Sequence, residues 1–272
     1  MTLLAIESAT DMVGVALVRD DGGSAERLHL GGRAHAERLV PAIEEVCAAS
    51  GCTVADVDTI AVDVGPGLFT GLRVGVATAK ALAQALGVGV VAVTSLDVLA
   101  SAAAGRATGP GLVVSVVDAR RGEVFAAAYR FDQATGSLGA DEQSDARHGG
   151  PVDPASVRHD RLEPISPEAL SAWLDELGSE AGRIIVVGDG AVRYRQLLAG
   201  HRWIDLDLAE EHSYPPPLAL AALARVRLDR GWATVPADVL VPEYRRAADA
   251  RINWEQRTPR PPTPDMGRGR AS

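Results

Sequence analysis

Residues 3–19 read LLAIESATDMVGVALVR, and residues 112–131 read LVVSVVDARRGEVFAAAYRF. In each stretch an apolar run ends at an acidic residue, Glu7 or Asp118, and a short polar turn leads into a second apolar run. Apolar runs on either side of a polar turn are typical of two antiparallel strands. The repetition predicts a duplicated strand–turn–strand unit, with two unrelated hairpins as the alternative.

Strand and helix patterns alternate along the rest of the chain, which indicates an α/β fold. Apolar residues at helical spacing predict the helices, and short β-branched runs predict buried strands. The predicted strands cover residues 3–7, 13–18, 25–30, 59–64, 88–93, 112–117, 123–131 and 183–187. The predicted helices cover residues 35–50, 70–86, 167–177 and 218–230.

A run of glycine and small residues at 105–111 predicts a boundary between two lobes. We expect an N-terminal lobe over residues 1–106 and a C-terminal lobe over 107–246. An alternative for the helix at 218–230 is that it packs back on the first lobe. Residues 247–272 are rich in Pro, Arg and Gly and poor in apolar side chains, a composition that is typical of a disordered tail.

Composition places the 272-residue chain among globular proteins, with 47% apolar residues. No apolar run reaches the roughly 18 residues that a membrane span needs. The formal net charge of −9 argues against tight independent binding to nucleic acid, which relies on a basic surface. The N-terminus lacks a basic signal region, and Cys47 and Cys52 do not have redox or zinc spacing. These features predict a cytoplasmic protein with free thiols and no membrane contact.

The sharpest local signal is Gly65–Gly75 (GPGLFTGLRVG), between a predicted strand and a predicted helix. Glycines permit a tight turn there, and free amides at a helix start attract anions. A P-loop requires Lys and then Ser or Thr after its last glycine, whereas Leu72 and Arg73 follow Gly71. A dinucleotide fingerprint requires a different glycine spacing and an acid about 20 residues later, where this chain has valines. Neither motif is present. The candidate loop residues are Gly65, Gly67, Thr70 and Arg73.

The helix after this loop carries a row of small residues at four-residue spacing: Gly71, Gly75, Ala79 and Ala83. Residues at this spacing share one helix face. A smooth face allows another element to approach closely. That element is either the protein's own sheet or a helix of a partner, and the sequence leaves both open.

Metal and hydrolase sites find little support in the sequence. His35 begins a predicted helix, but Leu39 stands one turn later, so a helical histidine pair for a metal is missing. Neither Gly-x-Ser-x-Gly nor His-Glu-x-x-His occurs. Asp118, Arg120 and Glu123 form a candidate polar cluster at the second turn, with an ion-paired turn as the alternative. We predict no metal, no cofactor and no catalytic residue.

The chain resembles the TsaB family, also called YeaZ, in six phrases: Leu3–Thr10 (LLAIESAT), His35–Ile43 (HAERLVPAI), Gly65–Gly75, Asp118–Phe125 (DARRGEVF), Val187–Gly190 (VGDG) and Pro242–Arg245 (PEYR). Their combination is specific, whereas one phrase alone is not, and the resemblance covers about residues 1–246. It implies an actin-like fold of the sugar-kinase and Hsp70 superfamily. That fold has two similar lobes, each with a mixed sheet flanked by helices.

The resemblance also implies a non-catalytic role. TsaB-family proteins pair with the transferase TsaD through helices of the N-terminal lobe, and with the ATPase TsaE they form threonylcarbamoyladenosine in tRNA. The resemblance implies direct pairing with TsaD, contact with TsaE within the complex and indirect contact with tRNA. It also implies a homodimer through the same surface. The partner interface expected by analogy consists of His35, Leu39, Ile43, Gly71, Val74, Gly75, Thr78, Ala79 and Leu82.

Two residues depart from the family pattern. Glu7 stands where many relatives have Asp, and Leu68 replaces a serine; both changes argue against an intact nucleotide loop. The competing hypothesis is a stand-alone actin-like phosphotransferase or carbamoyltransferase, in which Glu7, Asp118 and Asp189 would hold a phosphate and a metal. A third hypothesis, a peptidase, lacks both the second histidine and a nucleophile motif.

Overall fold

The computed structural model describes residues 1–31, 34–107, 110–131, 158–160 (backbone only) and 163–245. The strands are β1 (Thr2–Glu7), β2 (Met12–Arg19), β3 (Ser24–Leu30), β4 (Thr59–Asp63), β5 (Gly89–Val93), β6 (Gly111–Arg120), β7 (Glu123–Phe131), β8 (Arg158–Asp160), β9 (Ile184–Val187) and β10 (Ile204–Asp205). The helices are α1 (His35–Ala49), α2 (Phe69–Leu86), α3 (Ser95–Ala104), α4 (Pro167–Ala181), α5 (Asp189–Arg193), α6 (Arg195–Leu198) and α7 (Pro217–Asp229), with a short 3₁₀ helix η1 (Val54–Asp56). The predicted tail, residues 247–272, lies outside the described residues.

Two five-stranded sheets repeat one topology. The first has the order β3-β2-β1-β4-β5, and the second has the order β8-β7-β6-β9-β10. In each sheet the first three strands are antiparallel; a fourth strand joins the central strand in parallel, and the fifth joins the fourth in parallel. The prediction of two similar units, each with a mixed sheet, is therefore confirmed. The sequence missed β8 and β10, because runs of 3 and 2 residues carry no periodic signal.

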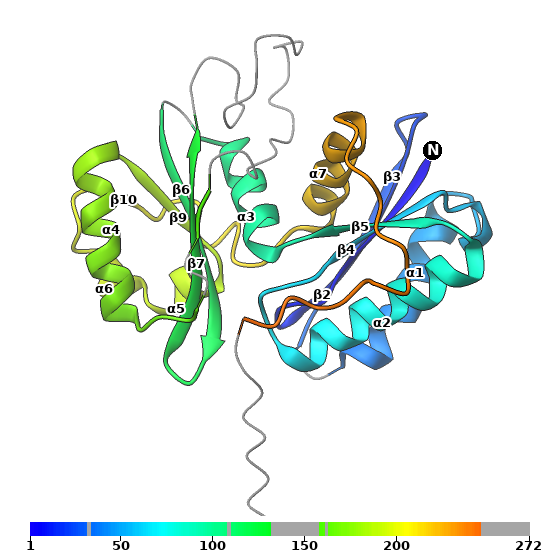
Figure 1. Cartoon of the computed structure of the whole chain (residues 1–272), viewed down its shortest axis with the longest axis horizontal. Coiled ribbons are helices and arrows are strands. Elements are labelled where there is room, and N and C mark those ends of the chain that lie inside the picture. The colour runs from blue at the N-terminus through cyan, green and yellow to red at the C-terminus, as the bar shows by residue number, and fades with distance from the viewer. Residues whose placement is uncertain (32–33, 108–109, 132–157, 161–162, 246–272) are drawn as a thin grey trace, which may run out of the picture.

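The first sheet is buried on both faces, which explains the unbroken apolar sequence of β1. Leu4 and Ile6 join the cluster that includes residues of α1 and α2. Leu3 and Ala5, on the opposite face of the strand, join the cluster that includes residues of α7. Figure 1 shows α1 and α2 together on one side of this sheet and α7 on the other.

Two helices cross between the halves of the chain. α3 follows β5 of the first sheet but packs against β6 of the second, and α7 packs against β1 and β2 of the first. The two helices are joined by a buried ion pair, in which Arg227 donates to Asp97 at 2.8 Å, and Tyr129 of β7 donates to the same carboxylate at 2.9 Å. Division of the chain at residue 106 stays a prediction, since α3 lies before that residue and packs beyond it.

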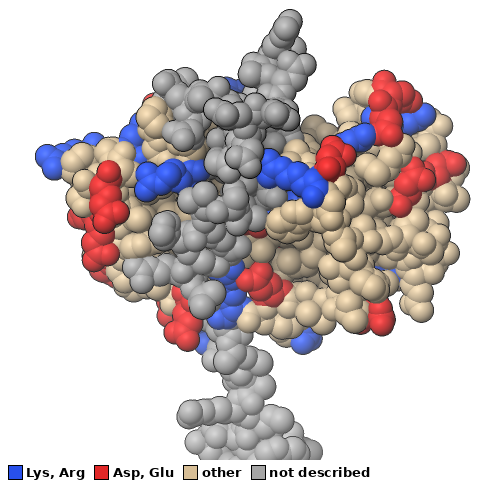
Figure 2. All heavy atoms as spheres, turned by 45° about the horizontal axis from the view of Figure 1, so that its top comes forward, with Lys and Arg blue, Asp and Glu red and all other residues tan. Residues whose placement is uncertain are grey.

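The surface carries charges of both signs. Figure 2 shows basic and acidic side chains interspersed over one face of the molecule. In the described ranges no helix is long and apolar enough to cross a membrane. Cys47 and Cys52 are free thiols, the first buried and the second half-buried.

Candidate functional site

The glycine loop packs tightly against the turn between β1 and β2. A Cβ atom on Gly67 would lie 2.1 Å from the carbonyl oxygen of Ala9, and one on Gly71 would lie 2.0 Å from that of Ser8. Leu68, just before α2, donates its backbone N–H to the same Ala9 oxygen at 2.6 Å. Only glycine permits such close approach of two backbones. The loop therefore fixes α2 to the β1–β2 turn. The backbone amide of Leu68, which an anion would otherwise bind, already donates to Ala9.

The row of small residues on α2 faces the protein's own sheet. A Cβ atom on Gly75 would lie 2.2 Å from Ser8 Oγ, and Ala79 and Ala83 are part of the core of the first sheet. Gly71, Gly75 and Ala79, which the resemblance places on a partner surface, therefore pack against the protein's own sheet, the other alternative that the sequence left open.

The predicted interface residues on α1 are also buried. His35 Nε2 is hydrogen-bonded to the carbonyl oxygen of Thr10 at 2.8 Å, and Leu39 and Ile43 belong to the core. These three residues hold α1 on the sheet, and their contact with a partner stays a prediction. The remaining predicted interface residues are half-buried: Val74, Thr78 and Leu82.

The outer face of α2 consists of other residues. Ala77, Ala81 and Ala85 are exposed at four-residue spacing, and Val40 of the neighbouring α1 is 52% exposed. The sequence contained a signal for this face, since these alanines form a second small-residue row on the same helix. The predicted interface contains the row with the glycines, which is the buried one.

A cavity of about 910 Å³ lies where the two strand–turn–strand units meet. Arg120, from the turn of the second unit, donates to Asp11, from the turn of the first, at 2.7 Å. The hydrogen bond with Asp11 raises the pKa of Arg120. The cavity is lined by Asp11, Leu30, Gly31, Leu68, Thr70, Arg120 and Tyr214. Thr70 and Arg120 are thus the predicted polar residues that the structure brings together here, whereas Asp11 and Tyr214 were missed.

Asp118 is the centre of an ion-paired turn. Its carboxylate accepts from Arg120 Nη1 at 3.2 Å and from Arg193 Nη1 at 2.9 Å. Asp189 accepts from the backbone N–H of Asp118 at 2.8 Å, and burial raises the pKa of Asp189 to about 6. Glu123 lies opposite Arg120 in the register of β6 and β7. This arrangement is the ion-paired turn that the sequence left as an alternative, extended by Arg193 and Asp189.

Glu7 does not reach the cavity, because it is fully buried beside Asp63 at the ends of β1 and β4. Glu7 Oε1 accepts from the Ala9 N–H at 2.8 Å. Asp63 Oδ1 accepts from the Gly65 N–H at 2.7 Å and from Ser95 Oγ at 2.8 Å. Burial, together with the charge of Asp63, raises the pKa of Glu7 well above its ordinary value. The pair is placed to hold a strand end and the glycine loop, so the candidate polar residue Glu7 lies away from the cavity.

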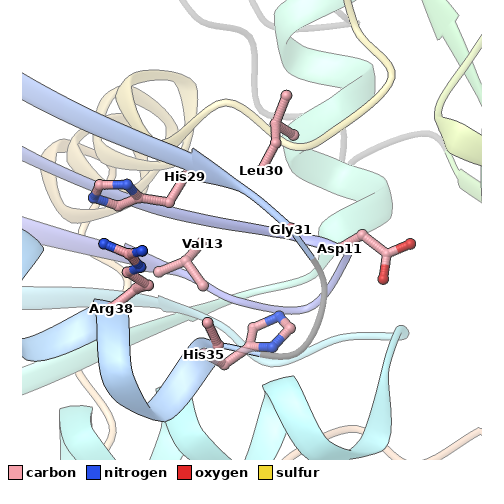
Figure 3. Close-up of a pocket in the computed structure, with 8 residues that line it drawn as sticks. Asp11, Val13, His29, Leu30, Gly31, His35 and Arg38 are labelled. Carbon is pink, nitrogen blue, oxygen red and sulfur yellow. The ribbon is translucent and has the colours of Figure 1, made fainter.

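A smaller pocket of about 180 Å³ lies between the end of β3 and the start of α1. Figure 3 shows His29 and Arg38 on one side of it and Asp11 at the other end. His35 also lines it, but its Nε2 is already bonded to Thr10. Among the residues that the structure describes, no three His, Cys, Asp or Glu side chains form a group that could hold a metal ion.

Comparison with known proteins identifies the family. The chain is 30% identical over 262 residues to the Bacillus subtilis (strain 168) "tRNA threonylcarbamoyladenosine biosynthesis protein TsaB", covering 93% of this chain and 98% of that protein. The chain belongs to the TsaB family. The TsaB protein of Escherichia coli (strain K12) is 33% identical over 198 residues, covering 71% of this chain and 80% of that one.

Other comparisons agree with the TsaB family. The crystal structure of YeaZ from Pseudomonas aeruginosa matches 89% of this chain and 99% of that chain, with 27% identity and a TM-score of 0.64. Residues 29–148 match the family model "TsaD: tRNA N6-adenosine threonylcarbamoyltransferase". The TsaB-family chain shares the fold of YeaZ, and its two repeated mixed sheets flanked by helices are those that its sequence predicts.

In this TsaB-family chain, Arg73 joins α2 to the segment after α7. Its guanidinium lies 3.8 Å from the centroid of the Phe69 ring, and its Nε donates to Tyr244 Oη at 3.2 Å. The rings of Phe69 and Tyr244 are 5.2 Å apart. Gly65 is buried under the same segment, since its Cβ would lie 3.2 Å from the Glu243 carbonyl oxygen. The predicted loop residues Gly65 and Arg73 therefore hold the C-terminal segment and do not line the cavity.

Proposed function

We propose that this chain is a non-catalytic subunit in the formation of threonylcarbamoyladenosine in tRNA, and that it pairs directly with a TsaD-type transferase. TsaE joins the complex as a further subunit, and this chain contacts tRNA only through its partners. Membership of the TsaB family supports the process. The observation that carries the pairing is the exposed small-residue row on the outer face of α2.

The outer faces of α1 and α2 have the features of a helix-docking surface. Ala77 and Ala81 expose small side chains one helical turn apart, which lets a partner helix come close to the α2 backbone. Val74 and Leu82 are half-buried beside this row, and Val40 adds exposed apolar area on the adjacent helix. An apolar centre of this kind gives most of the binding energy of an interface, because it is fully desolvated in the complex.

The variant Ala77→Glu/Ala81→Glu tests this surface. Glutamate is a good helix former, so α2 is expected to stay folded. Two carboxylates at the centre of an apolar interface are expected to weaken pairing by about 100-fold or more, because their desolvation costs several kcal/mol. The matched control is Ala172→Glu, on an exposed position of α4 in the other half of the molecule.

Each protein is mixed with the TsaD of the same organism and examined by size-exclusion chromatography with light scattering, and then by an assay of tRNA threonylcarbamoylation. We expect a heterodimer and full activity with the wild-type chain and with the control, and neither with the double variant. A double variant that pairs normally would show that the interface lies elsewhere. If the isolated wild-type chain is a homodimer, conversion of the double variant to a monomer would place both interfaces on this face.

The alternative, a stand-alone nucleotide-dependent phosphotransferase or carbamoyltransferase, has less support. Glu7 is fully buried beside Asp63, and the carboxylate of Asp118 is already bound by Arg120 and Arg193. Nucleotide turnover by the pure chain, lost in Asp118→Asn, would favour this alternative.

A further inference from the structure

Three polar side chains form a hydrogen-bonded chain on the outer side of the second sheet, where α4 lies beside α6 (Figure 1). Ser171 and Asp175 stand one turn apart on α4, and His201 lies just after α6. The distance from Ser171 Oγ to His201 Nε2 is 2.8 Å, and the distance from His201 Nδ1 to Asp175 Oδ1 is 2.6 Å. No sequence motif predicts this cluster, because its members come from two separate segments.

The chemistry of Ser171, His201 and Asp175 decides which atom carries each proton in this hydrogen-bonded cluster. An ionised carboxylate only accepts hydrogen bonds, so Nδ1 of a neutral His201 carries the proton that points to Asp175. Nε2 is then the acceptor, and the hydroxyl of Ser171 donates to it. A hydroxyl, a basic nitrogen and an orienting carboxylate in this order form the arrangement that activates a serine as a nucleophile. Such arrangements are recognised by geometry and not by sequence position.

The three residues of the cluster are all partly exposed to solvent. Ser171 is half-buried, and the side chain of His201 is 17% exposed. Asp175 is 56% exposed, so water screens its charge. We therefore assign to Asp175 only the role of orienting the imidazole ring of His201. The backbone N–H of Ser171 belongs to the hydrogen-bond ladder of α4. We therefore assign to the site only the gain that general-base assistance provides, about 100-fold.

We propose that Ser171 is a nucleophile that accepts acyl groups from activated esters, with His201 as general base and Asp175 as a positioning residue. Ser171 Oγ forms a bond to the carbonyl carbon of the ester, and the bond from that carbon to the leaving phenolate breaks. The hydroxyl proton passes to His201 Nε2 and from there to the phenolate. The products are an ester on Ser171 and a free phenol, and no oxidation or reduction takes place.

The chain offers controls within one peptide. Trypsin cuts after Arg161 and Arg183, so a single peptide contains Ser166, Ser171 and Ser179. Ser179 is an exposed serine of the same helix whose hydroxyl donates to the Glu176 carbonyl oxygen at 2.7 Å, without a histidine. The full chain is incubated with p-nitrophenyl acetate, and the rate of acetylation of each serine is read from fragment ions in mass spectrometry.

We expect Ser171 to be acetylated about 100-fold faster than Ser179, and His201→Gln to remove this difference. Asp175→Asn keeps a polar neighbour for the ring and is expected to slow acetylation several-fold while the midpoint of urea unfolding stays unchanged. A purely structural role, in which the three side chains tie α4 to the segment after α6, would move the midpoint and leave acetylation alone. Equal acetylation of Ser171 and Ser179, or no effect of His201→Gln, would overturn the proposal.

Discussion

The close contact between Gly75 on α2 and Ser8 after β1 gives a quantitative test of which face of α2 packs against the sheet. In Gly75→Ala the new Cβ would lie 2.2 Å from Ser8 Oγ, so either the side chain or the helix must shift. Overpacking of this kind costs about 1–3 kcal/mol. Replacing glycine by alanine inside a helix contributes about 1 kcal/mol in the other direction. We expect Gly75→Ala to lower the free energy of unfolding by about 0–2 kcal/mol.

The sign is expected to reverse when the hydroxyl of Ser8 is removed. In Ser8→Ala the hydrogen bond from Ser8 Oγ to the Gly71 carbonyl oxygen is lost, at a cost of about 1 kcal/mol. A Cβ at position 75 then has the position-8 Cβ at 3.4 Å and Ile6 Cγ2 at 3.6 Å, which are ordinary contacts. In this background Gly75→Ala should stabilise by about 1 kcal/mol through helix propensity alone.

The four proteins of this double-mutant cycle are compared by urea unfolding, followed by both tryptophan fluorescence and circular dichroism. The two substitutions should couple by about 1–3 kcal/mol. Additivity within about 0.5 kcal/mol would show that the two positions are not in contact. That result would refute the buried placement of the glycine row and return it as a candidate docking surface.

Two further predictions concern pH. Because the pKa of Glu7 is well above its ordinary value, the folded chain keeps a proton that the unfolded chain loses above about pH 4, so stability falls as pH rises, by up to about 1.4 kcal/mol per pH unit. Glu7→Gln should remove this slope in unfolding midpoints measured between about pH 5 and pH 9, whereas the exposed control Glu44→Gln should keep it. Burial raises the pKa of Asp189 to about 6, so its contribution is lost between about pH 4 and pH 6 as pH rises. Asp189→Asn should flatten the midpoint over that window, and an unchanged slope would show that Asp189 titrates normally.

The sequence predicted the parts of the fold that carry a strong period or a repeated pattern. Both strand–turn–strand units and helices α1, α2 and α7 were found because their apolar residues recur over several turns or strands. Strands β8 and β10 are too short to show alternation, and their pairing depends on distant segments. No local pattern in the sequence records such pairing.

The candidate site was harder to predict, because α2 has two rows of small residues. One row contains Gly75 and the other contains Ala77, and each is equally smooth by sequence. The contacts of Gly71 and Gly75 with Ser8, and the burial of Ala79 and Ala83, show which row faces the sheet. Arg193 and Asp11 were missed for a related reason: each meets Asp118 or Arg120 across a separation that only the fold closes.

The contacts around the two turns oppose a movement in which the two halves open and close on a ligand. The amide of Leu68 binds the Ala9 carbonyl oxygen, where a phosphate-binding loop would leave its amides free. Arg120 binds Asp118 within its own turn and Asp11 across the cavity, so one guanidinium ties the two halves together. Separating the halves would break the Arg120–Asp11 ion pair, whereas Asp118 would keep both arginines; for so exposed a pair the cost is up to about 1 kcal/mol, which substrate binding would have to offset. The proposed rigid subunit, whose docking surface we place on the outer face of α2, does not meet this cost. Under that proposal the ion pair of Arg120 with Asp11 is a clamp that holds the two turns together.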